Sequence, residues 1–428
     1  MEKTIVLITF ILTYLSLLML PKYRAYLALG AATLFVGFGL VFPSTLDALT
    51  LVSAIDWNVI LMIAGTMIVV SYFIESKAPV VLADLIINRV STVKWAVIAL
   101  AFFSGLISAF IDNVATVLIV APIATTIAKR LKISPVPMII AITVSANLQG
   151  FATLVGDTTS IILASTANLN FADFFFLQGR IGPFFVVQIG ALSTIFVMLS
   201  LFKNLNQPME KLPKEKMLDV MPSVFLILII ALLIAVSFIP NRPALSNGFV
   251  TIGVALIASM YQLWRHRSLE KIKAAFGQID FNTLGLLIGL FMVIATLNEV
   301  GIIADIAQLF IQIGGTNPFV MFSLAVWVSV LLSAFIDNIP YVATMLPVMA
   351  ALAPDLGVNP LLLYFGLLAG ATLGGNLTPI GASANIAGIG ILRNEGYEVK
   401  FADFAKIAIP MTLAAVTSAY VLLWILWA

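Results

Sequence analysis

The hexapeptide Ser-Ala-Phe-Ile-Asp-Asn occurs twice in this chain, and both copies lie within long apolar stretches. The copies run from Ser108 to Asn113 and from Ser333 to Asn338. Each places an ionisable side chain, Asp112 or Asp337, among residues typical of a membrane interior. Because a charge at membrane depth is costly, it usually serves a function. The duplication therefore predicts a transporter built from two related halves.

The composition indicates a polytopic membrane protein. Of the 428 residues, 61% are hydrophobic and only 10% are charged, and the mean hydropathy is +1.12. No soluble domain of this length could bury so much apolar surface. The chain has no cysteine, and its single histidine, His266, lies in a basic loop. We therefore expect no disulfide, no cofactor and no metal site beyond bound Na⁺. The expected partners are a small ion or solute and the lipid bilayer, with no nucleic acid.

Apolar runs of membrane-spanning length predict the topology. Simple crossings are expected at 4–20, 25–42, 57–75, 181–202, 222–240, 246–264, 281–299 and 407–427. The remaining apolar material predicts re-entrant hairpins at about 94–132 and 317–353, and broken crossing helices at about 135–167 and 359–391. The expected fold is an all-α membrane protein with ten crossings and two hairpins. Scaffold helices are expected at 1–92 and 222–316, transport parts at 93–202 and 317–428, and a cytoplasmic linker at 203–221.

The distribution of basic residues predicts the orientation. With this topology, 19 of the 22 lysines and arginines fall on one side, and only Lys3, Arg180 and Arg242 fall on the other. By the positive-inside rule the first side is cytoplasmic. Both termini of this multi-pass cell-membrane protein are therefore expected outside the cytoplasm.

The repeat extends well beyond the hexapeptide. The motif Ile-Asp-Trp-Asn at 55–58 returns as Ile-Asp-Phe-Asn at 279–282, and Pro122 in the first hairpin returns as Pro347 in the second. Each half carries five crossings plus one hairpin, and five is an odd number. The halves must therefore insert upside down relative to each other, which is the inverted-repeat plan of secondary transporters.

Hairpin tips and helix breaks provide irregular backbone, which survives at membrane depth only where it lines a cavity or is buried in protein. Their freed carbonyls and polar side chains are hard oxygen ligands that suit Na⁺, or a carboxylate that carries a proton. The candidate cation ligands are Asp112, Asn113, Gly150, Thr153, Asp157, Asp337, Asn338, Gly375 and Thr378. The candidate solute contacts are Asn113, Thr158, Thr159, Asn338, Ser383 and Asn385.

Helix capping is the competing explanation for the acids. Asp112 and Asp337 could simply cap the second arm of each hairpin, although serine or asparagine would do so without burying a charge. For Asp56 and Asp280, which start crossing helices, N-capping is the simpler account.

Three segments carry a resemblance to a known family. The first is the hexapeptide at 108–113. The others are Asp-Asn-Ile-Pro-Tyr-Val-Ala-Thr-Met-Leu-Pro at 337–347 and Leu-Gly-Gly-Asn-Leu-Thr-Pro-Ile-Gly-Ala-Ser-Ala-Asn at 373–385. They resemble the ion transporter superfamily, and within it the arsenite permease and melanosomal P protein branch. More distant relatives are divalent anion:sodium symporters and sodium/proton antiporters. The resemblance implies a homodimer with a fixed scaffold and a mobile transport domain.

Two departures from the family pattern bear on the substrate. Dicarboxylate transporters of the superfamily carry Ser-Asn-Thr at the hairpin tips, where this chain has Asp-Asn-Val at 112–114 and Asp-Asn-Ile at 337–339. The break at 156–160 reads Gly-Asp-Thr-Thr-Ser, where relatives carry Gly-Asp-Pro-Pro-Asn. The acids at the tips weaken any prediction of dicarboxylate transport.

The predicted function is cation-coupled secondary transport of a small ion or oxyacid by an elevator-like motion. Three intramembrane acids, Asp112, Asp157 and Asp337, with no candidate buried lysine or arginine, favour a site that holds cations. A Na⁺/H⁺ antiporter without another substrate is the main alternative, and a passive channel is a weaker one. An intramembrane aspartyl protease is also considered, but such proteases pair a Tyr-Asp motif with Gly-x-Gly-Asp, and the chain contains no Tyr-Asp.

Overall fold

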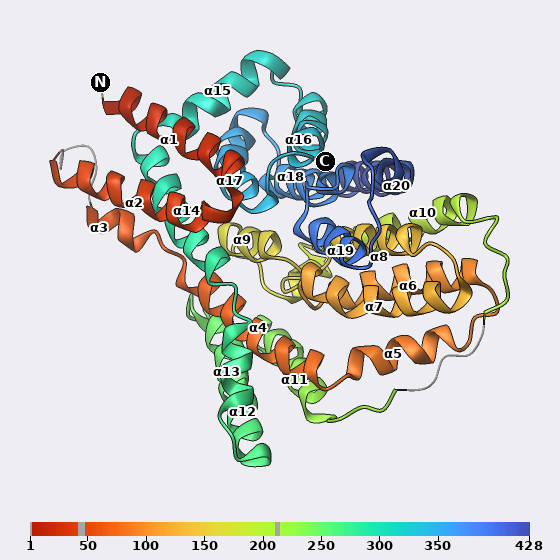
Figure 1. Ribbon diagram of the computed structural model, residues 1–428. Coiled ribbons are helices and arrows are strands. Elements are labelled where there is room, and N and C mark those ends of the chain that lie inside the picture. Colours follow the sequence, from red (N-terminus) through yellow and green to blue (C-terminus); the bar gives the residue numbers. More distant parts are fainter. Residues whose placement is uncertain (1, 42–47, 210–214) are drawn as a thin grey trace.

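The computed structural model describes residues 2–41, 48–209 and 215–428, which are almost entirely helical (Figure 1). The first half contains α1 (Glu2–Met19), α2 (Arg24–Val41), α3 (Ala48–Ser53), α4 (Trp57–Glu75), α5 (Ala78–Ile87), α6 (Val93–Ser108), α7 (Asn113–Leu131), α8 (Val136–Leu148), α9 (Thr158–Thr166) and α10 (Pro183–Leu201). Short 3₁₀ turns at Pro21–Tyr23 and Ala172–Phe174 and a small hairpin of β1 (Phe176–Leu177) and β2 (Arg180–Ile181) complete it.

The second half repeats this order of helices. It contains α11 (Met221–Ser237), α12 (Ser246–His266), α13 (Glu270–Gly277), α14 (Phe281–Glu299), α15 (Ile302–Gly314), α16 (Pro318–Ser333), α17 (Asn338–Leu356), α18 (Pro360–Gly374), α19 (Ser383–Asn394) and α20 (Phe401–Trp427). A 3₁₀ turn, Gly375–Leu377, follows α18. Each helix from α1 to α10 therefore has a counterpart from α11 to α20 in the same sequence position.

Packing follows the same repeat. Helix α2 packs against α14 while its counterpart α12 packs against α4, and the hairpin arms α6 and α16 pack against α8 and α18. Where α4 crosses α12 and where α14 crosses α2, a glycine lets the backbones approach. A Cβ added at Gly65 would lie 2.8 Å from the carbonyl oxygen of Thr251, and one at Gly289 would lie 2.7 Å from that of Ala28. These crossings fix the register of the two halves: Gly65 corresponds to Gly289, and Thr251 corresponds to Ala28.

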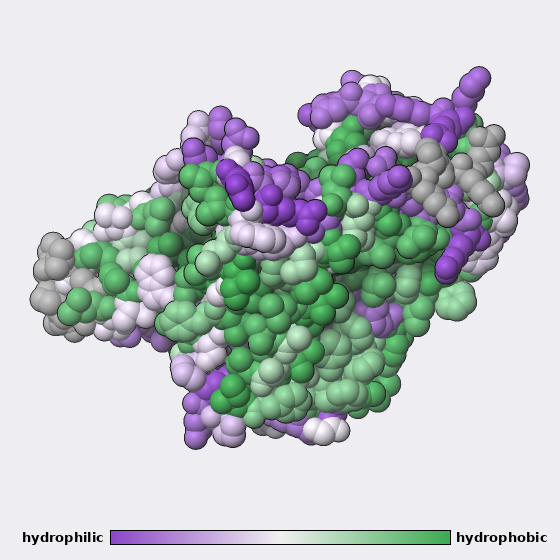
Figure 2. Space-filling model, turned by 90° about the horizontal axis from the view of Figure 1, so that it is seen from below, coloured by the Kyte–Doolittle hydropathy of each residue, from purple (hydrophilic) through white to green (hydrophobic). Residues whose placement is uncertain are grey.

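The outer surface is suited to a bilayer. Within the described ranges, eight helices are long and apolar enough to cross a membrane. Two further pairs, α1 with α2 and α15 with α16, bend by 114° and 111° at short breaks and would add one span each. Figure 2 shows a broad apolar band on one face, bordered by hydrophilic residues along its upper edge. The protein is therefore an all-α, polytopic membrane protein, as the composition predicts.

The helices turn and break where the sequence analysis predicts, whereas the count of ten crossings and the re-entrant nature of the hairpins stay predictions. Helices α6 and α7 form a hairpin that turns at Asp112, and α16 and α17 form one that turns at Asp337. The predicted broken helices are α8 with α9 and α18 with α19. The short helices α3 and α13 and the strand pair were not predicted. The division into scaffold and transport domains stays a prediction.

The linker between the halves is attached to the first half. The backbone amides of Val93 and Lys94 donate to the carbonyls of Gln207 and Leu205, at 3.0 and 2.8 Å. Residues 210–214, which include the predicted cytoplasmic lysines at 211 and 214, lie outside the described residues.

Candidate functional site

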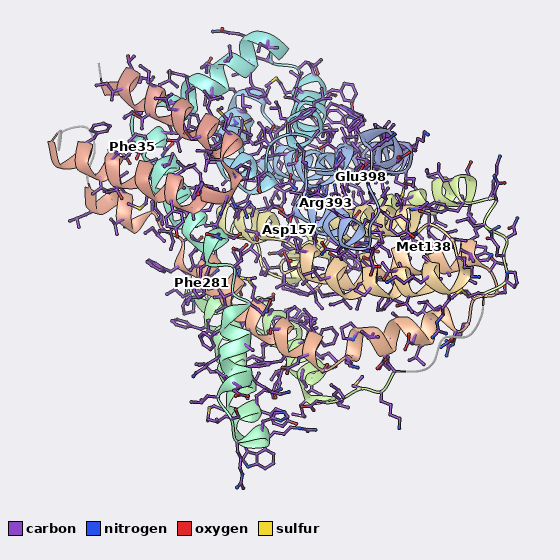
Figure 3. All side chains as sticks on the ribbon, in the orientation of Figure 1. Phe35, Met138, Asp157, Phe281, Arg393 and Glu398 are labelled. Atoms are coloured by element: carbon purple, nitrogen blue, oxygen red, sulfur yellow. The ribbon has the colours of Figure 1, made fainter. Side chains whose placement is uncertain are left out.

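The two hairpins and the two broken helices pack together in pairs. Helix α7 of the first hairpin packs against α19, and α17 of the second hairpin packs against α9. Figure 3 places Asp157, at the start of α9, near the middle of the molecule. Sequence segments more than 170 residues apart are thereby brought to one central region.

The first half forms a compact polar cluster around Gly150. A Cβ added at Gly150 would lie 2.9 Å from Cβ of Asp157 and 3.1 Å from Nδ2 of Asn113. The hydroxyl of Ser108 donates to Oδ1 of Asn113 at 2.7 Å, and the hydroxyl of Ser160 donates to the carbonyl of Gly150 at 2.9 Å. The glycine is needed here because any side chain would push the amide and the carboxylate apart.

The second half forms the equivalent cluster around Gly375. A Cβ added there would lie 2.8 Å from the carbonyl oxygen of Gly381 and 3.2 Å from Oδ1 of Asn338. The hydroxyl of Ser333 donates to Oδ1 of Asn338, as Ser108 does to Asn113. Asn385 takes the place of Ser160, and its Nδ2 donates to the carbonyl of Gly375 at 3.2 Å.

The two clusters also share a threonine. Thr153 donates to the carbonyl of Ala109, and Thr378 donates to the carbonyl of Ala334, so each threonine fastens a helix break to a hairpin turn. All of these partners lie 225 positions from their counterparts. The structure therefore brings Asn113, Gly150, Thr153 and Asp157 to one cluster, and their role as ion ligands stays a prediction.

The clusters differ at one chemically important position. Ala382 takes the place of Asp157, so only the first half adds a carboxylate from its helix break. Oδ1 of Asp157 accepts from the amide of Thr158 at 2.8 Å, and Oδ2 accepts from the hydroxyl of Thr159 at 2.8 Å. Ser383, the counterpart of Thr158, is exposed.

The hairpin-tip acids do cap helices, as the competing explanation required. Oδ1 of Asp112 accepts from the amides of Val114 and Ala115, at 3.0 and 3.1 Å, and Oδ1 of Asp337 accepts from the amide of Ile339 at 3.0 Å. In each acid Oδ2 takes no part in the cap. Capping and a second function are therefore compatible in both residues. Asp56 and Asp280 cap α4 and α14 as predicted, accepting from the amides at 59 and 283.

The sequence analysis found no candidate buried lysine or arginine, but in the structure a partly buried arginine does reach one of the acids. Arg24, at the start of α2, forms an ion pair with Oδ2 of Asp337, and the two side chains are only 21% and 33% exposed. Arg24 lies in a predicted loop between two apolar runs, so the topology prediction placed it at the cytoplasmic surface. Only the packing of α2 near the second hairpin reveals the contact.

Two buried asparagines that the sequence analysis did not select link the halves. Nδ2 of Asn147 donates to the carbonyl of Thr372 at 2.8 Å, and Nδ2 of Asn376 donates to the carbonyl of Val144 at 3.2 Å. Oδ1 of Asn147 also accepts from Nδ2 of Asn113 at 3.1 Å. The sequence signal that could have identified them is an asparagine that lies inside an apolar run and away from a helix start.

The two helix breaks differ in accessibility. Val155 in the first break is 5% exposed, whereas its counterpart Ile380 in the second break is 66% exposed. Likewise Ile161 is 5% exposed and Ile386 is 53% exposed. The first break is covered because α9 packs against α4.

A cavity of about 550 Å³ borders the covered break. It lies between the start of α4, the end of α9 and the loop from α11 to α12. Asp56, Ser165, Arg242 and Asn247 are in its wall, and Ser165 donates to the carboxylate of Asp56. The cavity gives the first break a polar neighbour on the side of α4 and α12.

Comparison with known proteins identifies the family. The family model described as "Citrate transporter" (CitMHS) matches residues 7–370. An uncharacterized transporter of Mycobacterium tuberculosis is 32% identical over 387 residues, which cover 87% of each chain. The mouse P protein is 25% identical over 452 residues, but the match covers 85% of this chain and only 53% of the P protein.

The fold also has solved relatives. The crystal structure of the YdaH transporter of Alcanivorax borkumensis superposes with a TM-score of 0.62 at 15% identity, covering 94% of this chain and 98% of that one. These matches confirm the resemblance to the ion transporter superfamily, and they exclude the protease alternative because the relatives are transporters. The chain therefore belongs to the CitMHS family of membrane transporters.

Proposed function

We propose that this transporter is coupled to Na⁺ or H⁺ and moves a small ion or oxyacid by an elevator-like motion. The observation that carries the proposal is the pair of equivalent clusters around Gly150 and Gly375. Each brings a hairpin-tip asparagine against a helix break within a mostly buried, oxygen-rich environment. Paired sites of this kind, at broken helices, are how inverted-repeat transporters hold coupling ions.

The chemistry of the clusters favours a cation. Their side chains and carbonyls supply hard oxygen atoms, and Asp157 adds a carboxylate to one of them. Within the described residues the one basic side chain beside a hairpin-tip acid is Arg24, which already pairs with Asp337. At the hairpin tips a carboxylate substrate would therefore find little free positive charge to bind.

Alternating access is supported by the unequal exposure of the two breaks. In our proposal the ten crossings form two inverted repeats, and the 19-to-3 charge split puts both termini outside. Helix α19 then runs toward the cytoplasm, so the exposed second break belongs to a state open to that side. Exchanging the conformations of the two repeats would open the first break to the opposite side. The homodimer is retained as part of the proposal, on the family resemblance.

Na⁺/H⁺ antiport is the second candidate, and Asp157 favours it. If Asp157 and Asp112 share a small volume, their two carboxylates can hold a proton between them. A cation that binds there would displace that proton, and the two ions would then compete for one site. Symport of a solute needs no such competition.

Thermal unfolding of the purified protein tests the proposal. We expect Na⁺ or Li⁺ to raise the unfolding temperature saturably, whereas choline should not, because a ligand bound only to the folded state stabilises it by about 2.7 kcal/mol at 100 times its Kd. Asn113→Ala and Asn338→Ala should each weaken this response. A solute such as arsenite or citrate that stabilises only when the cation is present would indicate symport. No specific response to any cation at any pH would contradict the proposal.

A further inference from the structure

Arg24 links the scaffold to the tip of the second hairpin. Its Nη1 pairs with Oδ2 of Asp337, and nearby the hydroxyl of Tyr14 on α1 donates to the carbonyl of Pro340 at 2.8 Å. Within the described residues, Arg24 is the one basic side chain in an ion pair with a hairpin-tip acid. The contact therefore joins two parts that must separate if the hairpin moves relative to the scaffold.

A short relay holds the guanidinium in place. Nη2 of Arg24 donates to the hydroxyl of Thr283 at 3.3 Å, and this hydroxyl donates to Oδ2 of Asp280 at 2.6 Å. Asp280 also caps α14 through the amide of Thr283 at 3.0 Å. The relay fixes Arg24 to the scaffold, so the arginine cannot travel with the hairpin.

The other half lacks both parts of this arrangement. The crossings at Gly65 and Gly289 align Thr251 with Ala28. Asn247 lies four residues before Thr251, as Arg24 lies four residues before Ala28, so a neutral amide takes the place of the guanidinium. Val59 takes the place of Thr283, because each lies three residues after the acid that caps its helix.

The contacts between scaffold and hairpin also differ between the two halves. Helix α14 packs against α17, whereas the counterpart pair, α4 with α7, makes at most marginal contact among the described residues. Asp112, the counterpart of Asp337, has no ion pair with any described basic side chain. The ion pair thus belongs to the state in which the second break is exposed.

We propose that Arg24 is a tethered cation that occupies Asp337 after the transported cation has left on the side of the open second break. This inference rests on the proposed cation coupling. The guanidinium and a free cation cannot both neutralise one carboxylate, because the two positive charges repel at contact distance. Arg24 therefore competes with the ion, favours its release, and holds the empty hairpin against the scaffold. Asn247 carries no charge and cannot compete with a cation at Asp112, so this competition occurs in one end state only.

Distance measurement between spin labels tests the proposal. The chain has no cysteine, so Tyr26→Cys on the scaffold and Phe335→Cys at the hairpin tip, 72% and 70% exposed, provide unique label sites. In the absence of Na⁺ we expect a short-distance population that Na⁺ diminishes. Arg24→Gln should diminish it without Na⁺ and tighten the apparent Kd for Na⁺ by about tenfold, which corresponds to about 1.4 kcal/mol. Arg24→Lys, which keeps the charge, should retain part of the short-distance population.

The control is Lys22→Gln, which removes a positive charge from the same turn without touching Asp337. Lys22 is exposed and lies over the ring of Tyr23, so this variant should behave like the parent protein. Equal behaviour of Arg24→Gln and Lys22→Gln would overturn the proposal.

If Arg24→Gln does not fold, Asp337→Asn should diminish the short-distance population, and the charge exchange Arg24→Asp with Asp337→Arg should restore it. A failure of both would also overturn the proposal. If neither Na⁺ nor H⁺ has any effect on the parent protein, the result contradicts the proposed cation coupling and not the role of Arg24.

Discussion

Replacing Gly150 by alanine is the sharpest test of the first cluster. The added Cβ would lie 2.9 Å from Cβ of Asp157, 3.3 Å from its Cγ and 3.1 Å from Nδ2 of Asn113. Carbon atoms in contact prefer about 3.5–4.0 Å, so the carboxylate must move by roughly 0.6–1 Å. Neither neighbour can move freely. Asp157 is fixed by its cap on α9, and Asn113 is held by Ser108 and Asn147.

The size of the effect follows from this crowding. Overpacking a well-packed site costs about 1–3 kcal/mol. If that cost falls on the ion-binding geometry, the apparent affinity for the cation drops by about 5- to 150-fold. The protein should still fold, because the strain is confined to a turn and a helix start. The measurement is the unfolding temperature as a function of Na⁺ concentration, which gives the apparent Kd.

The matched control is Gly30→Ala. Gly30 is exposed on α2, and a Cβ there meets nothing within 4 Å. This variant should leave the Kd for Na⁺ unchanged. The reasoning is refuted if Gly150→Ala binds Na⁺ as tightly as the parent protein, because the cluster around Gly150 could not then be the ion site. It is also refuted if Gly30→Ala weakens binding to the same degree.

Three further outcomes are expected. If Asp157 takes part in proton competition, the apparent affinity for Na⁺ should fall as the pH drops, and Asp157→Asn should flatten that dependence; a pH-independent affinity in the parent protein would favour solute symport. Asp112→Asn and Asp337→Asn should each abolish coupled uptake into proteoliposomes while the protein stays folded, because asparagine caps about as well as aspartate; full uptake by both would leave capping as their only role. A single cysteine at Lys216 should be labelled only from the cytoplasm and one at Asn241 only from outside, and labelling of both from one side would overturn the inverted topology.

The hairpins and helix breaks were predictable because their signals are local. A carboxylate with a following asparagine interrupts an apolar run, and glycine-rich segments interrupt the next one, in both halves. The roles of Asp56 and Asp280 as caps were predictable for the same reason, since a cap is a contact within four residues. Short helices such as α3 and α13 lack the length that makes a periodic pattern visible.

The position of Arg24 was not predictable, because its partner lies 313 residues away. A basic residue between two apolar runs reads as a loop charge under the positive-inside rule. That rule counts residues by side and carries no information about what a loop touches. The bend of 114° between α1 and α2, together with the packing of α2 against α14, is what brings the guanidinium to the hairpin tip.

The near-symmetry of the fold gives meaning to the few positions that break it. Two halves with identical side chains would give two end states of equal energy, related by exchange of the repeats. The affinity for the ion would then be the same in both states. Asp157 opposite Ala382, and Arg24 opposite Asn247, remove this equivalence. The first pair adds a negative charge to one cluster, and the second adds a positive charge beside the hairpin of the other. In our proposal the repeated backbone therefore provides the two states, while these charges determine in which of them a cation is held and in which it is displaced.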